Sequence, residues 1–316
     1  MPDAYDSPWK RAIDAYFQDF LALLFPEAHQ GIDWEKDCKS LDTELQKLGP
    51  GHRLGGRTVD KLVEVTHQDG KKSLILVHVE VQAQRDSRFE KRMFVYHYRI
   101  FDRYNCQVVS LAVLADASRA WRPSGFGYSQ WGCRLQLDFP VAKLLDFDWE
   151  ELSASSNPFA VLVQAHQKTQ ATRADSPERM RWKLALAKGL YEGGLGKEDI
   201  VTLFGFIDQL MALPDGLDKQ FRIELTMFED EKNMPYVTSF ERAGIKKGLE
   251  QGKRDMARES ILEALKVRFG QVPDAMKRRV ESISDLADCR TLHQTAIRAA
   301  SLEAFEQRLD EVVGED

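Results

Sequence analysis

One run of twelve residues, SLILVHVEVQAQ at positions 73–84, constrains the fold of this chain more than any other segment. Its β-branched residues predict a strand, in which successive side chains point to opposite faces of a sheet. One face is entirely apolar and comprises Ile75, Val77, Val79, Val81 and Ala83. The other face carries the polar side chains of His78, Glu80, Gln82 and Gln84. Because burial of the apolar face fixes the register, we expect Glu80 and Gln82 to project together from a rigid element.

A second strand is predicted upstream, over residues 57–66, and the sequence HQDGKK between the two strands predicts a tight hairpin turn. In an antiparallel hairpin the beginning of the first strand lies beside the end of the second. We therefore expect Asp60 to lie near Glu80 and Gln82, at the end of the hairpin that is far from the turn.

The predicted meeting of Asp60 and Glu80 indicates a metal site. Two carboxylates form a hard-oxygen site suited to Mg²⁺, with Mn²⁺ as an alternative, and water and a substrate phosphate complete the coordination. Such an ion supports hydrolysis of a phosphodiester. In this prediction Asp60 and Glu80 hold the metal. A single acidic residue on a strand is usually only solvated, so the hypothesis depends on the combination, and His78 is interpreted as a structural residue.

The remaining pattern predicts an α/β fold. Apolar residues at helical spacing predict a helix over residues 9–25, which Pro26 ends. After the central strand we expect a helix over residues 89–104 and strands over residues 108–114 and 134–139. A strand, a crossover helix and another strand are typical of a sheet that contains a parallel pair. Beyond Phe147 helical periodicity dominates, so the C-terminal half is expected to be all-helical.

Three regions follow from this pattern: an α/β domain at 1–150, a helical region at 151–238, and a long helix with a small helical domain at 239–316. The long helix, predicted over residues 239–269, carries Gly244, Gly248 and Gly252 at four-residue spacing. Two interpretations stay open. Small residues permit close approach of two helices, as in a homodimer formed through the C-terminal helices, and they also occur in flexible linkers.

The motif residues resemble those of a known family. Asp60, the tripeptide Glu80-Val81-Gln82, and Arg92-Met93 with Tyr96 on the next helix are similar to the recombination-promoting nuclease (Rpn) or YhgA-like putative transposase family, within the PD-(D/E)XK nuclease superfamily. The segment WKRAIDAYFQDFLALLFP resembles the opening helix of that family, and residues 57–123, with HVEVQ and YRIFDRY, resemble its core. The stretch from ILEALKVRFGQVP to SLEAFEQRL resembles a helical domain often attached to it. The resemblance covers the first half of the chain well, the end moderately and the middle poorly.

This resemblance implies a restriction-endonuclease-like PD-(D/E)XK core, which is a mixed sheet flanked by helices, and a Mg²⁺-dependent DNA endonuclease acting in recombination or transposition. It gives Asp60 and Glu80 as metal ligands, with the main-chain carbonyl of Val81 as a further ligand. It places Gln82, which would orient water, where the superfamily usually has lysine. Glutamine orients a group by hydrogen bonds but supplies no positive charge. Asp60 also follows Val59, where the superfamily motif has proline.

A group of arginines near the motif is a candidate DNA contact. On a helical projection they fall in one sector, which contains Arg85, Arg88, Arg92, Arg99 and Arg103. Contacts from such a ridge to DNA phosphates would contribute affinity and positioning, and we rank Arg85, Arg88 and Arg92 first because they are nearest the motif. The alternative is a solvated face whose arginines pair with Asp86, Glu90 and Asp102.

The net charge of −6 argues against a polyanionic partner at first sight. However, positions 1–145 contain 20 basic and 19 acidic residues, whereas the remainder contains 24 and 31. The acidity therefore lies in the C-terminal half, and the first half is compatible with DNA as a partner.

Composition also bears on the location of the protein. Four cysteines without close pairing indicate neither a zinc cluster nor a disulfide framework. No apolar stretch is long enough to span a membrane and the N-terminus lacks a signal-peptide pattern, so we expect a cytoplasmic protein.

Two rival functions stay open at the level of sequence. The first is a catalytically inactive nuclease-fold module that binds DNA or a protein, which the missing lysine and the acidic net charge favour. The second is a nuclease toxin or defence effector with another nucleic acid as substrate. Failure to bind metal would favour the first, and preferential cutting of RNA would favour the second.

Overall fold

The computed structural model describes residues 6–42, 58–68 and 74–313, with the side chains of 6–7, 58–60, 239–249 and 313 outside that description. The chain divides into two compact units, Met1–Tyr236 and Val237–Asp316. The predicted hairpin turn HQDGKK lies mostly outside the described residues.

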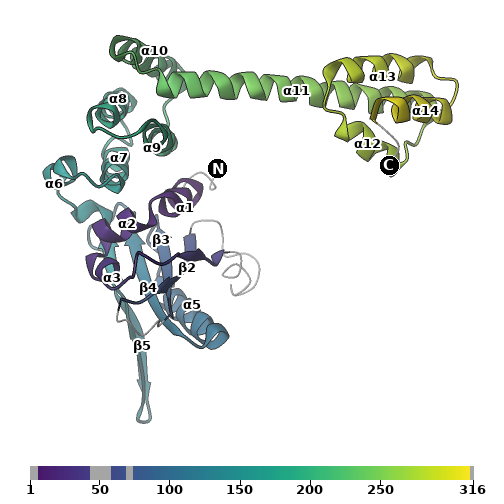
Figure 1. The fold of residues 1–316 in the computed structure, drawn as a ribbon. Helices are drawn as coiled ribbons and strands as arrows, with labels where there is room; N and C mark the ends of the chain where they lie inside the picture. Colours follow the sequence, from purple (N-terminus) through teal and green to yellow (C-terminus); the bar gives the residue numbers. More distant parts are fainter. Residues whose placement is uncertain (1–5, 43–57, 69–73, 314–316) are drawn as a thin grey trace. The chain divides into compact units, whose positions relative to one another are not determined.

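A mixed five-stranded sheet forms the centre of the first unit, in the order β1-β2-β3-β4-β7 (Figure 1). The antiparallel side consists of β1 (Lys39–Ser40), β2 (Thr58–Thr66) and β3 (Leu74–Gln82). The parallel side continues from β3 to β4 (Gln107–Leu114) and β7 (Val141–Lys143). The antiparallel hairpin and the parallel pair predicted from the sequence are both confirmed.

The crossover between β3 and β4 is α5 (Phe89–Tyr104), whose bounds agree with the predicted helix. Its buried residues recur every three or four positions, as expected for a helix with one face on a sheet: Phe89, Met93, Tyr96 and Ile100. Asn105 ends the helix in the left-handed conformation, with φ 46°, and its main-chain N–H donates to the carbonyl of Phe101. Asparagine adopts this conformation more readily than most residues.

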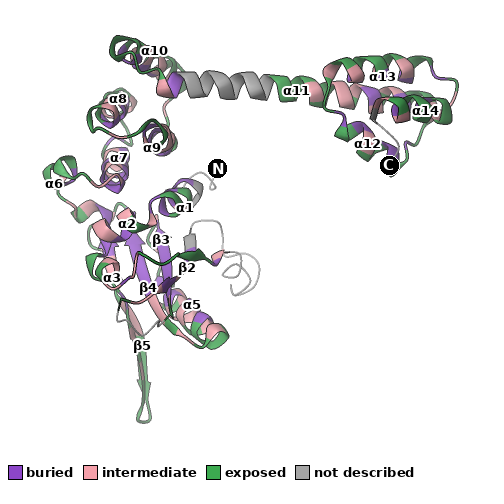
Figure 2. Ribbon diagram, viewed as in Figure 1, coloured by how far each residue is buried: buried purple, intermediate pink, exposed green. Residues whose placement is uncertain are grey.

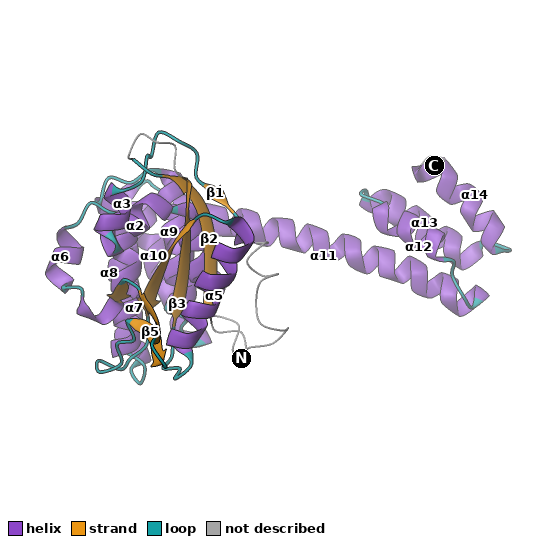
Figure 3. Ribbon diagram, turned by 90° about the horizontal axis from the view of Figure 1, so that it is seen from below, coloured by secondary structure: helices purple, strands orange, loops and turns teal. Residues whose placement is uncertain are grey.

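Both faces of β3 are covered. On one face, Leu62 and Leu76 pack with Tyr96 and Ile100 of α5. On the other, residues of α2 (Phe17–Leu24) and α3 (Pro26–Gln30) line a hollow together with Val77. Figure 3 shows these two helices on the side of the sheet opposite α5. As a result β3 is buried from Leu76 to Gln82 (Figure 2). The sequence led us to expect burial of the apolar face alone, which is wrong, because α5 also covers the polar face.

The N-terminal segment is not the single helix predicted over residues 9–25. It forms α1 (Asp6–Ala15) and α2, separated at Tyr16, whose backbone leaves the helical region at φ −130° and ψ 43°. The hydroxyl of Tyr16 donates a hydrogen bond of 3.1 Å to Asp199, which holds the residue at this break.

A two-stranded arm, β5 (Gly125–Gln130) and β6 (Cys133–Asp138), projects from the first unit (Figure 1). Sequence reasoning predicted a strand over residues 134–139 but missed β5, since glycine is unfavourable within strands. Both glycines are required here. A Cβ on Gly125 would lie 2.9 Å from the carbonyl of Leu137, and one on Gly127 would lie 2.9 Å from that of Leu135.

Helices follow the sheet in the first unit. After a 3₁₀ turn (Leu144–Asp146) they are α6 (Trp149–Ala154), α7 (Phe159–Ala171), α8 (Ser176–Glu192), α9 (Lys197–Leu210) and α10 (Asp215–Lys232). Phe159 of α7 packs its ring on Trp9 and Phe20 at centroid distances of 5.9 and 5.2 Å, which joins these helices to α1 and α2. None of the helices that the structure describes combines the length and hydrophobicity required to cross a membrane.

The second unit begins one residue into α11 (Tyr236–Phe269) and continues with α12 (Asp274–Ser282), α13 (Leu286–Arg298) and α14 (Leu302–Val313). It has a hydrophobic core of its own, which includes Ile261, Leu265, Val280, Leu292, Phe305 and Leu309. Gly244 and Gly248 lie in the stretch 239–249, whose side-chain surroundings are outside the description, and a Cβ on Gly252 would meet nothing within 4 Å. The predicted dimer contact of this glycine series stays a prediction.

Candidate functional site

The register of the hairpin brings two of the predicted site residues together. Asp60 is the direct partner of Glu80, and Thr58 is the partner of Gln82. Residues directly opposite one another in an antiparallel ladder belong to the same face of the sheet. The side chain of Asp60 lies outside the described part of the structure, so only its position in the register is established. Val81 lies between Glu80 and Gln82 and its side chain is buried on the opposite face.

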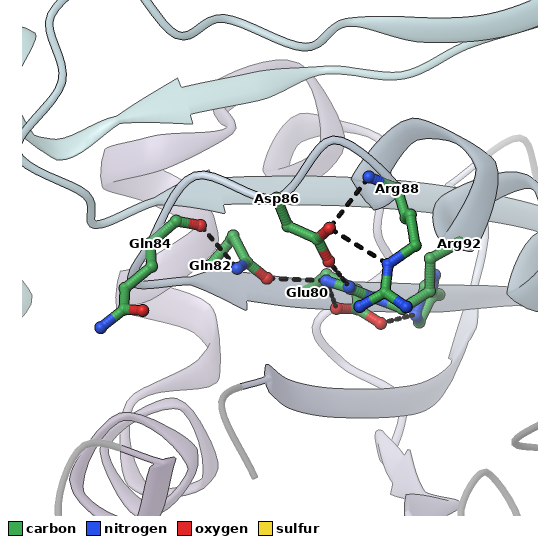
Figure 4. A network of polar contacts seen from close by, with 7 residues as sticks. Glu80, Gln82, Gln84, Asp86, Arg88 and Arg92 are labelled. Atoms are coloured by element: carbon green, nitrogen blue, oxygen red, sulfur yellow. Dashed lines mark hydrogen bonds and ion pairs between the residues drawn. The ribbon is translucent and has the colours of Figure 1, made fainter. Parts of the chain in front are cut away.

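Glu80 and Gln82 are both buried, with 0% and 4% of their surface exposed. Arg92 of α5 contacts both of them (Figure 4). Its Nη2 donates to Gln82 Oε1 at 2.7 Å and lies 3.4 Å from Glu80 Oε2. The amide nitrogen of Gln82 donates to the carbonyl of Gln84 at 2.6 Å, so both ends of the glutamine side chain are held.

Asp86, in the loop between β3 and α5, completes this network (Figure 4). Its Oδ2 accepts from Arg92 Nη1 at 2.7 Å, and its Oδ1 accepts from the main-chain N–H of Arg88 at 2.9 Å. Burial opposes ionisation of Asp86, but these hydrogen bonds and the charges of the two arginines outweigh it. They hold the pKa of Asp86 below its ordinary value.

The three arginines predicted to contact DNA differ in their surroundings. Arg85 and Arg88 precede α5, with Arg88 at its N-cap, so they do not share a helical face with Arg92. The expected single ridge from residue 85 to 103 is therefore wrong, because the helix begins only at Phe89. The side chain of Arg88 is 71% exposed, whereas that of Arg92 is 11% exposed and lies against Glu80 and Asp86. Their DNA contacts stay predictions.

A second series of polar contacts connects Glu80 with His78, Ser110 and His97. Nε2 of His78 is 3.7 Å from Glu80 Oε1, and its Nδ1 is 3.2 Å from Ser110 Oγ on β4. Ser110 Oγ is also 3.1 Å from Nδ1 of His97 on α5. Burial, together with the neighbouring His78, lowers the pKa of His97. Sequence reasoning missed Ser110 and His97, since only the packing of α5 across β3 and β4 brings them to His78.

We compared the chain with protein-family models, with curated proteins and with solved structures. Nothing matches. The chemistry of the site is therefore inferred from its own residues and contacts alone.

The oxygens at this site fit a hard cation in their chemistry. Glu80 supplies a carboxylate and Gln82 an amide oxygen, and the register adds Asp60 as the partner of Glu80. Arg92 holds Glu80 loosely at 3.4 Å, while its short bonds of 2.7 Å go to Gln82 and Asp86. Within the ranges that the structure describes, which omit the Asp60 side chain, no group of three His, Cys, Asp or Glu side chains is arranged to hold a metal.

A hollow of about 420 Å³ lies beside the network, at the carboxyl ends of the parallel strands β3 and β4. Its walls come from the two loops that follow these strands and from the first turn of α5, and include Arg85, Asp86, Glu90, Ser118, Trp121 and Arg122. In open α/β sheets ligands bind outside the carboxyl ends of the strands. Asp86 belongs to both the hollow and the Arg92 network, so a ligand in the hollow would contact this network through Asp86, which is linked to Gln82 by Arg92.

A buried ion pair supports the wall of this hollow. Lys143, at the end of β7, pairs with Asp116, which follows β4, and both side chains are at most 3% exposed. The ammonium of Lys143 lies 5.9 Å from the centre of the Trp121 ring, and Asp116 accepts from the N–H of Ser118 at 2.8 Å. Sequence reasoning missed this pair, because Asp116 and Lys143 are separated in the chain and only the parallel pairing of β4 with β7 joins them.

Proposed function

We propose that this chain is a metal-dependent DNA endonuclease of the PD-(D/E)XK type, similar to the recombination-promoting nucleases, with its site on β2 and β3. The observation that carries the proposal is the register, in which Asp60 is the direct partner of Glu80 and Gln82 follows two residues later. The mixed sheet, with a crossover helix between parallel strands, agrees with the core that the family resemblance implies.

Each residue then has a stated role. Asp60 and Glu80 would hold Mg²⁺, or Mn²⁺ in its place, with the Val81 carbonyl as a further donor. When bound, such an ion supplies Lewis-acid stabilisation of a phosphoryl oxygen. Gln82 orients water by hydrogen bonding, because a side-chain amide both donates and accepts. Arg92 positions Gln82, to which it donates at 2.7 Å, and Asp86 in turn holds Arg92.

DNA would reach this site along the hollow at the carboxyl ends of β3 and β4. Arg85 lies in its wall, and Arg88, which is 71% exposed, lies in the same loop. Both are cations that can contact phosphates without reading the sequence. Arg85 and Arg88 would therefore contribute to the affinity for DNA, whereas Arg92 would fix the positions of the side chains in the site.

The test is nicking of supercoiled plasmid by the purified protein with Mg²⁺ or Mn²⁺. Glu80→Gln keeps the shape of the buried side chain and removes its charge, so we expect loss of cleavage with the circular dichroism spectrum of the wild type. Glu64→Gln is the matched control, since Glu64 lies on β2 opposite Leu76, away from Asp60. Cleavage by Glu80→Gln at the wild-type rate would refute the assignment.

A second candidate is a nuclease-fold module that binds DNA or protein without cutting. The burial of Glu80 against the guanidinium of Arg92 favours it, because the arginine already neutralises the carboxylate. Calorimetric titration with Mn²⁺ separates the two functions. Saturable binding that Glu80→Gln abolishes supports the endonuclease, and absence of binding by the wild type supports the second candidate.

A further inference from the structure

The proposed chemistry does not use the β5–β6 arm. Phe126 is paired with Leu137 and Tyr128 with Leu135, so one face of the arm is apolar. At the root of the arm Phe126 stacks on Phe94 of α5, with ring centroids 5.1 Å apart. Further along, Tyr128 is 54% exposed. The apolar face therefore continues beyond the part that α5 covers.

The tip of the arm combines exposure with an unfavourable backbone conformation. Trp131 has φ 50° and Gly132 has φ 84°, in a two-residue turn between the paired residues Gln130 and Cys133. Positive φ at both turn positions identifies a type I′ turn, whose first position favours Asn, Asp or Gly and disfavours bulky residues. The Trp131 side chain is nevertheless 96% exposed. Trp131 is therefore unfavourable for the turn and buries almost none of its surface in the fold.

We infer that the β5–β6 arm enters a groove of duplex DNA and that the indole of Trp131 stacks on a base there. This inference rests on the proposed function, because the DNA that reaches Glu80 is the same DNA that the arm contacts. An indole stacks on any base through its π-face, and the contact is tolerant of sequence because every base has such a face.

The position of the arm favours DNA over a separate partner. Trp121 and Pro123 line the hollow beside the site, and β5 begins directly after it, at Gly125. The arm is also anchored on α5, the helix that carries Arg92. A ligand that lies in the hollow would therefore extend along the arm.

The length of the arm and its polar side chains also suit a groove of duplex DNA. A two-stranded ribbon fits the major groove, and six residues per strand make an arm roughly 20 Å long. The face opposite the aromatic residues carries Ser129, Gln136 and Arg134, which offer hydrogen bonds to base edges or phosphates. Arg134 and Asp138 are the two charged residues of the arm, so the arm does not repel DNA.

The experiment compares Trp131→Asn with Trp131→Phe in EDTA, which prevents cleavage. Binding is measured by fluorescence anisotropy with a short labelled duplex, and stacking by 2-aminopurine placed along it. Asparagine suits the type I′ turn, so the melting temperature should equal or exceed that of the wild type, which shows that the arm is intact. We expect Trp131→Asn to weaken binding about ten- to a hundredfold and to abolish the 2-aminopurine change, while Trp131→Phe retains both.

The outcomes separate this inference from the proposed function. Equal affinity of Trp131→Asn and the wild type would overturn the role of the arm and leave the endonuclease intact. Binding that depends on Trp131, without any metal-dependent cleavage, would support the arm and overturn the endonuclease. Absence of DNA binding by the wild type would overturn both. Self-association in sedimentation that Trp131→Asn abolishes, without an effect on DNA, would assign the indole to a second copy of the chain and overturn the inference.

Discussion

The stability of the first unit should depend on the protonation of His166. This residue of α7 is 0% exposed, and its ring makes a T-shaped contact with the Trp9 ring at a centroid distance of 5.7 Å. Burial lowers the pKa of His166 from 6.5 to about 4, even though the carbonyl of Ala115 favours the protonated ring. The unfolded chain therefore binds the proton more readily than the folded chain at every pH between these two values.

The sign and size of the effect follow from linkage. Because the folded-state pKa is depressed, the contribution of neutral His166 is present above pH 6.5 and is lost as the pH falls towards 4. A difference of 2.5 pH units between the folded and unfolded pKa values corresponds to about 2 kcal/mol of stability lost between pH 7 and pH 5. His97, whose pKa is also lowered, adds to the loss with the same sign.

Urea denaturation at pH 7 and pH 5, followed by tryptophan fluorescence, measures this loss. All six tryptophans lie before residue 237, so the signal reports on the first unit. His166→Gln should reduce the pH dependence by about 2 kcal/mol relative to the wild type, whatever its own stability at pH 7. Because the other titrating groups are the same in the wild type and in His166→Gln, their contributions to the pH dependence cancel in the difference. Identical pH dependence in the two proteins would refute the reasoning.

Four further predictions concern the Glu80 network and the neighbouring Arg88. Gln82→Ala should lower the single-turnover nicking rate about a hundredfold with little change in DNA affinity, whereas wild-type kinetics would exclude a role for the amide. Gln82→Lys places a second cation beside Arg92, which donates to Gln82 at 2.7 Å, so it should destabilise the protein, and adding Arg92→Gln should restore the melting temperature. Arg88→Ala should change the free energy of unfolding by less than about 0.5 kcal/mol, because the side chain is 71% exposed. It should also reduce the slope of the DNA-binding constant against salt concentration by about one released counterion. Arg92→Ala should lower the free energy of unfolding by about 3 kcal/mol, because it leaves Glu80 and Asp86 without this cation. Equal unfolding free energies for Arg88→Ala and Arg92→Ala would contradict the different roles of the two arginines.

The elements of the core could be predicted because their signals are local. The alternation along residues 73–84 predicted β3, and the spacing from Phe89 to Ile100 predicted α5. The hairpin then predicted that Asp60 lies near Glu80, and the register confirms this by making them direct partners. These signals lie within single elements or between neighbouring ones, where steric rules act directly.

The surroundings of the site could not be predicted in the same way. Alternation does not reveal that α5 covers the polar face of β3, so the burial of Gln82 was missed. A helical projection that began before Phe89 placed Arg88 and Arg92 on one face, although the N-cap lies at Arg88. The contact between His97 and Ser110 joins two elements, and only their packing determines it.

The network of Glu80, Gln82, Asp86 and Arg92 also affects how the protein folds. Its most distant members are only 12 positions apart, so closing it costs little loop entropy. Contacts between near neighbours in sequence form fast, whereas pairing of β4 with β7 must wait for later parts of the chain. During synthesis, residues up to the end of α5 already contain every group in the network. The geometry around Gln82 can thus begin to form before the ribosome has made the helices that follow the sheet.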